Sequence, residues 1–458
     1  MSHAGLDEAV AGLRRRTIGA QEKGFGAVAP VTAEELAARR PGLFDGAFTL
    51  PLAVLRDGAL RQNIGEMARY CAAAGVDLAP HGKTTMAPQL FARQLAAGAW
   101  AVTAATAGHV QAYRAFGVPR ILLANELTDP VGLGWLAAEM AADPGFDCYV
   151  YADSVDGARL LDEAFAAGRP GQPLPVLVEL GFPGGRTGCR TIAEAVAVAE
   201  TVGSAPSLRL AGAAGYEGGI GQDRSPATLD AVAGFCRELR KLGEIVRELA
   251  PGPGEVIVSA GGSVFFDVVA AELAAGRSAE AGSRVVLRSG AYVTHDHGLY
   301  AGLTPGAAGA AGGLHADSGL GGAGAAGGLD VGPRPGPAGA ALPALTPAFE
   351  LWAPVLSRPE PGLAVLCAGR RDVSFDAGMP VLLRVRDRGG QESGPEGMRV
   401  TMLADQHAYL TVPADSALAP GDVVCLGISH PCTMFDKWRV IPVVDDAYRV
   451  VDAVHTFF

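Results

Sequence analysis

The chain has 458 residues and a formal net charge of -11 at pH 7, with 37 basic and 48 acidic residues. This length predicts two domains, and the acidic balance argues against a nucleic-acid partner, which needs a basic surface. Seven scattered cysteines, no apolar signal segment and no run of about eighteen apolar residues predict a cytoplasmic protein with no membrane partner.

Residues 1–48 are expected to form a helical lead-in. Thr32 and Glu35 have the spacing of a capping box, in which the two residues at a helix start satisfy each other's amide groups. A strand is predicted over Thr49–Leu55, followed by an amphipathic helix. This strand precedes the first regular unit of the next region, so it could also join a later sheet.

Strand-length apolar runs alternate with helical patterns over residues 49–290. The eight predicted barrel strands are Val76–Ala79, Trp100–Ala104, Arg120–Ala124, Asp147–Tyr151, Pro175–Leu180, Leu208–Ala213, Val256–Ala260 and Arg284–Arg288. Eight βα units of this size predict an α/β fold, a (β/α)₈ TIM barrel. A doubly wound open sheet is the competing architecture, but no Gly-x-Gly-x-x-Gly opening accompanies the units.

Residues 291–458 are expected to form a second, β-rich domain, interrupted by a low-complexity Ala/Gly tract at about 302–342. The tract buries too little apolar surface to fold. The predicted strands of this domain are Phe349–Ser357, Gly362–Cys367, Pro380–Val385, His407–Val412, Asp422–Leu426 and Arg439–Val443.

The stretch 79–86, with the sequence Ala-Pro-His-Gly-Lys-Thr-Thr-Met, lies where the first barrel strand gives way to a helix. Lys83 would thus stand at the carboxyl end of a strand, which is the catalytic face of such barrels. A partly desolvated lysine there can attack carbonyls, so Lys83 is the candidate catalytic residue. Most lysines in such loops are solvated surface residues, which is the alternative.

Three loops on the same face could serve one cofactor. Gly261, Gly262 and Ser263 follow the seventh strand and open a helix, as phosphate-binding turns do. Arg186 lies in a glycine-rich loop after the fifth strand, and Tyr216 follows the sixth. A lysine, an anion site and a polar partner for a ring nitrogen are what pyridoxal phosphate (PLP) requires. Each loop alone could be only a turn or a packing element.

Near the C-terminus, His430 and Cys432 are candidate ligands for zinc, because an imidazole and a thiolate suit that ion. If the preceding strand continues to Cys432, its period of two would point both side chains to one side. A buried cysteine beside a hydrogen-bonded histidine is the alternative.

Three motifs, Pro-His-Gly-Lys-Thr-Thr, Ala-Gly-Gly-Ser and Ser-His-Pro-Cys-Thr-Met-Phe-Asp-Lys-Trp, resemble the D-serine dehydratase family of fold-type III PLP enzymes. These enzymes are related to alanine racemase and D-threonine aldolase, which implies an alanine racemase-like barrel. By this resemblance Lys83 forms the Schiff base, and the other cofactor-binding residues are His81, Arg186, Tyr216, Gly261, Gly262 and Ser263. His430 and Cys432 would bind Zn²⁺.

The resemblance implies a metal-assisted β-elimination that converts a D-3-hydroxy amino acid such as D-serine to a 2-oxo acid and ammonia. A D-threonine-aldolase-like retro-aldol cleavage is the nearest alternative, and Cys432 speaks mildly against it because D-threonine aldolases carry an aspartate there. A racemase and a non-catalytic PLP-binding protein are further alternatives. The segment Arg288–His297 matches the family only loosely, and His295 or His297 could join the metal or substrate site. A homodimer is expected by resemblance only.

Overall fold

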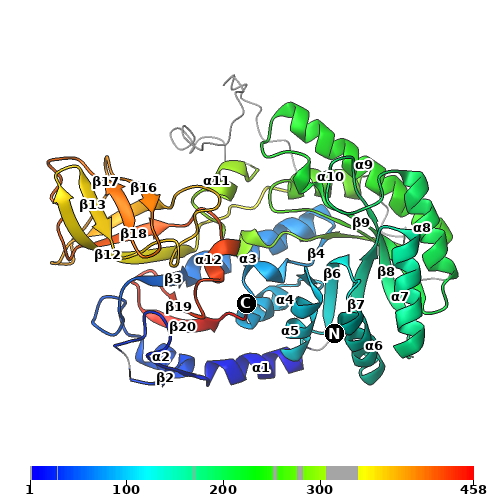
Figure 1. Ribbon diagram of the computed structural model, residues 1–458, viewed down its shortest axis with the longest axis horizontal. Helices are drawn as coiled ribbons and strands as arrows, with labels where there is room; N and C mark the ends of the chain where they lie inside the picture. Colours follow the sequence, from blue (N-terminus) through cyan, green and yellow to red (C-terminus); the bar gives the residue numbers. More distant parts are fainter. Residues whose placement is uncertain (1–2, 28, 169–170, 251–254, 276–281, 306–338) are drawn as a thin grey trace.

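The computed structural model describes residues 3–27, 29–168, 171–250, 255–275, 282–305 and 339–458. Figure 1 shows a barrel of strands and helices beside a mostly antiparallel β domain. Residues 306–338, the greater part of the predicted low-complexity tract, lie outside the described residues. No helix in the described part of the chain is long and apolar enough to cross a membrane.

The barrel consists of eight parallel strands in the order β4-β11-β10-β9-β8-β7-β6-β5. They are β4 (Asp77–Leu78), β5 (Val102–Ala104), β6 (Arg120–Glu126), β7 (Asp147–Ala152), β8 (Leu174–Leu180), β9 (Leu208–Gly215), β10 (Val256–Ala260) and β11 (Ser283–Leu287). The two ends of this order meet, since the N–H of Trp100 donates to Leu78 O at 2.7 Å and that of Thr103 to Pro80 O at 2.9 Å. The ring therefore closes, and the barrel prediction is confirmed over the open sheet.

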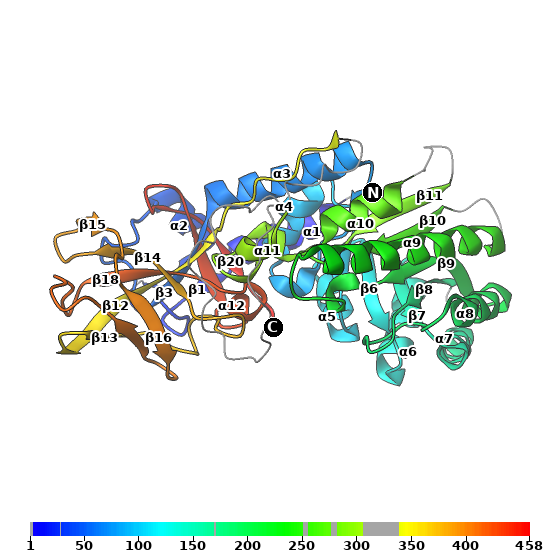
Figure 2. The same cartoon turned by 90° about the horizontal axis from the view of Figure 1, so that it is seen from above.

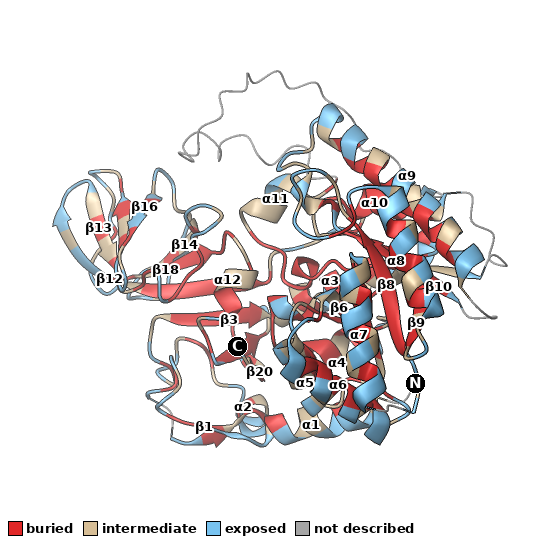
Figure 3. Ribbon diagram, turned by 45° about the vertical axis from the view of Figure 1, so that its right-hand side comes forward, coloured by how far each residue is buried: buried red, intermediate tan, exposed pale blue. Residues whose placement is uncertain are grey.

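Helices cover the outside of the barrel. They are α3 (Asp57–Ala74), α4 (Pro88–Ala96), α5 (Ala107–Ala115), α6 (Pro130–Ala142), α7 (Val155–Gly168), α8 (Ile192–Ser204), α9 (Pro226–Leu249) and α10 (Phe266–Ala274). Side chains of Thr106, Asp129, Thr191 and Ser225 cap four of them by accepting amide hydrogen bonds. The helix faces turned away from the strands are exposed, whereas the strands are buried (Figure 3).

Side chains inside the barrel change from apolar to polar towards the carboxyl ends of the strands. A buried cluster that includes Tyr151, Leu177, Ile257 and Val286 fills the centre. Glu179, Ser259 and Arg288 are buried as well. They lie two positions after Leu177, Ile257 and Val286, respectively. Because side chains alternate along a strand, these polar groups face the same interior. The mouth of the barrel is thus lined by polar side chains, and the apolar core lies beneath them.

The C-terminal domain is built on one sheet in the order β15-β14-β18-β12-β13-β17-β16. Its strands are β12 (Phe349–Glu360), β13 (Leu363–Leu366), β14 (Val381–Arg386), β15 (Glu392–Ser393), β16 (Arg399–Leu403), β17 (Ala408–Thr411), β18 (Val423–Gly427), β19 (Val440–Val444) and β20 (Val450–His455). Two short helices, α11 (Leu299–Leu303) and α12 (Cys432–Phe435), lie where this domain meets the barrel (Figures 1 and 2).

The early predicted strand is β3 (Leu52–Arg56), and it pairs with β12 and β19. It therefore belongs to the C-terminal sheet, one of the two positions left open by the sequence. The lead-in before it contains α1 (Ala4–Arg14), a two-stranded sheet of β1 (Thr17–Ile18) and β2 (Val31–Thr32), and α2 (Ala33–Arg39), so it is not wholly helical. The predicted capping box of Thr32 and Glu35 is present at the start of α2.

Candidate active site

Lys83 lies in the single turn η1 (Gly82–Thr84) that follows β4 at the mouth of the barrel. The turn requires glycine at position 82, because a Cβ there would approach the Tyr113 hydroxyl to 2.7 Å. Lys83 retains solvent exposure, but its amine is partly desolvated, and this burial lowers its pKa. Cys432 acts in the opposite direction, whereas the guanidinium groups of Arg186 and Arg288 lower the pKa further. A lowered pKa increases the fraction of neutral amine, which is the form that attacks a carbonyl.

Two histidines accompany Lys83. Burial lowers the pKa of His81 well below its usual value, and Lys83 lowers it further. His109, which sequence reasoning missed, lies in the first turn of α5 and stacks on Tyr113 with ring centroids 6.0 Å apart. Burial and Lys83 lower its pKa as well. Both histidines are therefore neutral at pH 7, and no spacing in the sequence links His109 to the lysine.

The predicted phosphate turn follows β10, but two of its amides hold a carboxylate of the protein itself. Gly261 N–H donates to Glu217 Oε2 at 3.1 Å, and Gly262 N–H donates to Glu217 Oε1 at 2.5 Å. Glu217 is fully buried. The backbone of Gly261, with φ of 101°, is left-handed and favours glycine. Because Glu217 occupies these two amides, an anion at this turn would have to bind Ser263 and the start of α10, unless Glu217 moves.

Arg186 and Tyr216 contact each other at the mouth of the barrel. The Arg186 guanidinium carbon lies 4.4 Å from the centroid of the Tyr216 ring, a cation–π arrangement. Both side chains are exposed to solvent. They come from the loops after β8 and β9, so the structure brings these two predicted residues together. The charge of Arg186 is available to an anionic ligand.

Arg288 is a second arginine at the site, and it was not among the predicted site residues. Its guanidinium donates to Ser259 Oγ at 2.8 Å and to Gly215 O at 2.6 Å. No carboxylate forms an ion pair with it among the described residues. The side chain is only 5% exposed, so its charge is buried and has no anionic partner there. Its position directly after the eighth barrel strand is the signal that could have identified it.

His430 and Cys432 lie at the edge of the C-terminal domain that faces the lysine turn. The Cys432 sulfur is 3.4 Å from Thr84 Oγ1. His430 Nδ1 is 2.6 Å from Asp376 Oδ2. Burial acts to lower the pKa of His430, but Asp376 and Cys432 outweigh it and raise this pKa to about 10. The lysine, the thiol and the imidazole therefore belong to one region.

The strand that was expected to carry the pair ends early. β18 stops at Gly427, and α12 begins at Cys432. Pro431, with φ of -65° and ψ of -39°, has helical geometry and no N–H for a strand ladder. The expectation that a period of two aligns the pair is wrong, although the two side chains still interact. Asp376 was also missed, because it stands 54 positions before His430.

His295 and His297 contact other groups. The N–H of His297 donates to Ile428 O at 2.9 Å, and its imidazole interacts with Glu350 and Arg384 of the C-terminal sheet. His295 is buried, and its N–H donates to Ala291 O at 2.8 Å. Burial lowers the pKa of each histidine to about 4. Neither histidine forms a hydrogen bond with the His430 or Cys432 side chain among the described residues.

The barrel and the mostly antiparallel β domain together form the fold of the alanine racemases. Alanine racemase from Bacillus anthracis has this fold, with 14% identity and a TM-score of 0.55 over 88% of this chain and 97% of its own. Residues 348–444 match the family described as "Putative serine dehydratase domain". The resemblance seen in the sequence is confirmed in fold and domain type.

Two kinds of lyase are similar to most of the chain. D-threonine aldolase of Arthrobacter sp. is 25% identical over 402 residues, covering 86% of this chain and 89% of that protein. D-threonine aldolase from Filomicrobium marinum is 25% identical, with a TM-score of 0.69 over 90% of this chain and 95% of its own. D-threo-3-hydroxyaspartate dehydratase from Delftia sp. is 23% identical, with a TM-score of 0.65 over 89% of this chain and 97% of its own.

The residues at the site fit the groups that this fold implies. The amine of Lys83, with its lowered pKa, suits a carbonyl cofactor, and two arginines without carboxylate partners among the described residues suit an anionic one. The imidazole of His430 and the thiol of Cys432 form a donor set that zinc favours. Asp376 holds the other ring nitrogen of His430, as carboxylates commonly do behind zinc-binding histidines.

Proposed function

We propose that this chain is a PLP-dependent lyase that acts on D-3-hydroxy amino acids with the help of a metal ion. The observation that carries the proposal is the contact between Thr84, next to Lys83, and Cys432. It supports the proposal because it brings the candidate lysine close to the candidate metal ligands His430 and Cys432. A substrate held there would present its amino group to the barrel and its 3-hydroxyl to the C-terminal domain.

PLP, bound through Lys83, supplies the electron sink that makes bonds at the substrate Cα labile. The free amine of Lys83 is suited to move a proton at Cα, because its pKa is lowered towards neutrality. The guanidinium groups of Arg186 and Arg288 suit the substrate carboxylate or the cofactor's anionic groups. We propose Ser263 and the start of α10 for the phosphate, and Tyr216 and His81 as neighbours of the cofactor ring.

A zinc ion at His430 and Cys432 supplies a Lewis acid for the substrate hydroxyl. His430 and Cys432 would hold the ion, and Asp376, 2.6 Å from Nδ1, would orient the imidazole of His430. Structures of D-threo-3-hydroxyaspartate dehydratase include a cysteine mutant in the metal-free form and a histidine mutant two positions earlier in that chain. The same spacing separates His430 from Cys432, which supports the proposed metal pair.

Retro-aldol cleavage is the reaction that the comparisons favour, because the D-threonine aldolases are similar to most of the chain. In this reaction the hydroxyl loses its proton, the Cα–Cβ bond breaks, and glycine and an aldehyde result. The D-serine dehydration expected first from the sequence is thus the second candidate. Cys432 and the match of residues 348–444 favour it. There the Cα–H and Cβ–O bonds break, and hydrolysis of the dehydrated product gives a 2-oxo acid and ammonia.

The test is a product assay with the full chain, PLP and zinc. D-Threonine, D-serine, D-3-hydroxyaspartate and their L-forms are supplied, and glycine, aldehyde, 2-oxo acid and ammonia are quantified. Glycine and aldehyde from the D-forms alone would establish the aldolase, whereas 2-oxo acid and ammonia would establish the dehydratase. Chelation and the Lys83→Ala substitution should each abolish turnover. No product from any substrate would contradict the proposal and favour a PLP-binding protein without turnover.

A homodimer, expected from the resemblance, is part of the proposal. Analytical ultracentrifugation of the PLP-loaded chain tests it directly. A monomer at micromolar concentration with full activity would contradict it.

A further inference from the structure

The glycine turn that follows β10, made of Gly261, Gly262 and Ser263, is held by a carboxylate from the loop of a neighbouring strand. Glu217 opens η2 (Glu217–Gly219), the single turn after β9, and is fully buried. Its Oε2 accepts the N–H of Gly261 at 3.1 Å, and its Oε1 accepts that of Gly262 at 2.5 Å. One charged group therefore binds two successive amides. Because hydrogen bonds to a charged acceptor are the stronger kind, this contact fixes the backbone of the turn.

The carbonyl groups of the same turn are held by the segment that follows β11. The N–H of Arg288 donates to Gly261 O at 3.2 Å. The hydroxyl of Ser289 lies 3.2 Å from both Gly261 O and Gly262 O, and it can donate to either oxygen. Arg288 and Ser289 are both buried. The turn is thus clamped between the segments after β9 and β11, which are the two neighbours of β10 in the barrel.

Two amides and one hydroxyl remain available at the turn. Among the described residues, the N–H groups of Ser263 and Val264 donate no hydrogen bond. Ser263 Oγ accepts the N–H of Ala291 at 3.2 Å, which leaves the hydrogen of this hydroxyl able to donate. Ser263 and Val264 are half-buried, whereas Gly261 is buried. These three donors, and not the amides that Glu217 binds, are therefore the ones that an anion at the barrel mouth can reach.

We propose that Glu217 is a positioning residue for the phosphate group of the cofactor. By binding the amides of Gly261 and Gly262, it fixes the turn so that Ser263 and Val264 present their donors to the phosphate. Glu217 acts through the turn and does not touch the phosphate, so its buried carboxylate stays in place when PLP binds. A preorganised set of donors binds an anion more tightly, because less ordering is required at the moment of binding. The inference rests on the proposed PLP site.

The negative charge of Glu217 is offset by two arginines of the same site. The guanidinium of Arg288 donates to Gly215 O at 2.6 Å, two residues before Glu217. Burial and Glu217 raise the pKa of Tyr216, whereas Arg186 and Arg288 act to lower it, so all three charged groups lie in the neighbourhood of this phenol. The two positive charges therefore limit the repulsion between Glu217 and a phosphate bound at the turn.

The test compares the binding of PLP with that of pyridoxal, which lacks the phosphate. The full chain is freed of cofactor with hydroxylamine and dialysed, and each compound is titrated while the absorbance of the bound form is recorded. We expect Glu217→Gln to weaken PLP binding by at least about tenfold, because the charge is lost and the NH₂ group of glutamine replaces one of the two acceptors. The affinity for pyridoxal should not change, since pyridoxal has no group for the turn to bind.

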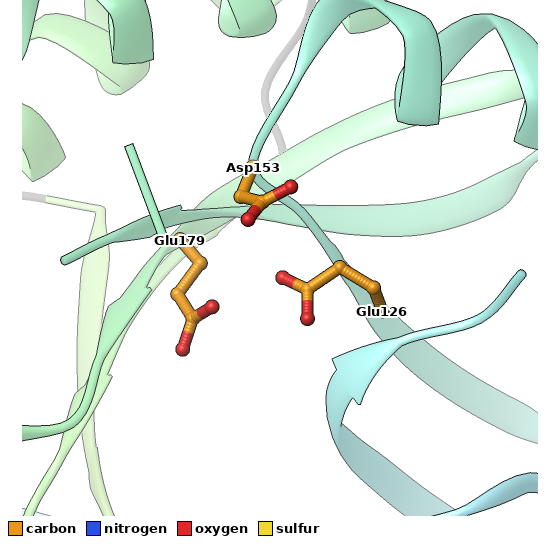
Figure 4. Close-up of side chains that lie close together, drawn as sticks. All are labelled: Glu126, Asp153 and Glu179. Atoms are coloured by element: carbon orange, nitrogen blue, oxygen red, sulfur yellow. The ribbon is translucent and has the colours of Figure 1, made fainter. Parts of the chain in front are cut away.

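Glu179→Gln is the matched control. Glu179 is a buried carboxylate of the same barrel mouth, but it lies with Glu126 and Asp153 (Figure 4) and binds neither amide of the turn. Both compounds should bind this variant with native affinity. If Glu217→Gln does not fold, Glu217→Asp keeps the charge but is too short to bind both amides, so it should show the same selective loss of PLP binding.

Tighter binding of PLP by Glu217→Gln would overturn the proposal, because Glu217 would then compete with the phosphate for the two amides. An equal loss of affinity for PLP and pyridoxal would overturn it as well, and so would an unchanged affinity for both. If the native chain binds no PLP, the proposed function itself fails, so the two failures are distinguishable.

Discussion

The hydroxyl oxygen of Thr84 lies 3.4 Å from the sulfur of Cys432, and this contact joins the lysine turn of the barrel to the C-terminal domain. The two residues are 348 positions apart in the chain. A thiolate that ligates a metal is stabilised by a hydroxyl donor of this kind. Under the proposed function, Thr84 would therefore tune the metal pair while its neighbour Lys83 binds the cofactor.

Replacing Thr84 with valine should weaken zinc binding at His430 and Cys432 by about tenfold, because the hydrogen bond to the sulfur is lost. Competition with a chromophoric chelator measures the zinc affinity. Thr84→Ser keeps the hydroxyl and is the matched control, so it should retain affinity close to that of the native chain. Equal affinity in the valine and serine variants would show that Thr84 only packs against the thiol.

Asp376 should matter for the same metal through His430. It accepts from Nδ1 of His430 and from the hydroxyl of Thr433. Asp376→Asn removes the charge that orients the imidazole, and we expect zinc affinity to fall by about 10- to 100-fold. Thr433→Val leaves the His430 contact in place and should have a smaller effect. The same chelator competition tests both variants, and an unchanged affinity for Asp376→Asn would exclude an orienting role.

Glu350 should be one of the residues most important for stability. It is buried and accepts hydrogen bonds from Arg56 at 3.3 Å, Arg384 at 2.9 Å and the Tyr448 hydroxyl at 2.7 Å. Glu350→Gln leaves two partly buried arginines without this anion, and we expect the free energy of unfolding to fall by about 3–5 kcal/mol. Glu392→Gln, which removes a more exposed partner of Arg384, should cost less than about 1 kcal/mol. Urea unfolding compares the two.

Acid should destabilise the protein through its buried histidines. Burial and Arg16 lower the pKa of His455 to about 4. The folded state therefore favours neutral His455, so its contribution to stability is present above the unfolded pKa of about 6.5 and is lost as pH falls towards 4. The loss is up to about 3 kcal/mol for this group.

His455→Gln should flatten the dependence of unfolding free energy on pH between 6.5 and 4. The difference in slope from the native chain isolates this histidine from the carboxylates that also titrate there. Near pH 8 the difference in unfolding free energy between the two proteins should not change with pH, since neither side chain changes charge there. Parallel curves across the acidic range would refute the assignment.

The barrel and the place of Lys83 at the end of its first strand could be predicted from the sequence alone. Alternating strand and helix patterns, each set by neighbouring residues, predicted the eight units that the structure shows. Lys83 was predictable because a strand's end can be read locally from Pro80 and Gly82. The His430 and Cys432 pair was visible as a motif, although its expected strand geometry was wrong at Pro431.

The contacts between residues far apart in the chain could not be predicted in this way. β3 pairs with β12, and Asp376 meets His430, across long separations that leave no trace in local periodicity. The same holds for Glu217, which occupies the amides of the predicted phosphate turn. Periodicity reports which face of an element is buried, whereas partner choice depends on how whole elements pack. For that reason the contacts of Arg288 with Ser259 and Gly215 could be found only in the folded barrel.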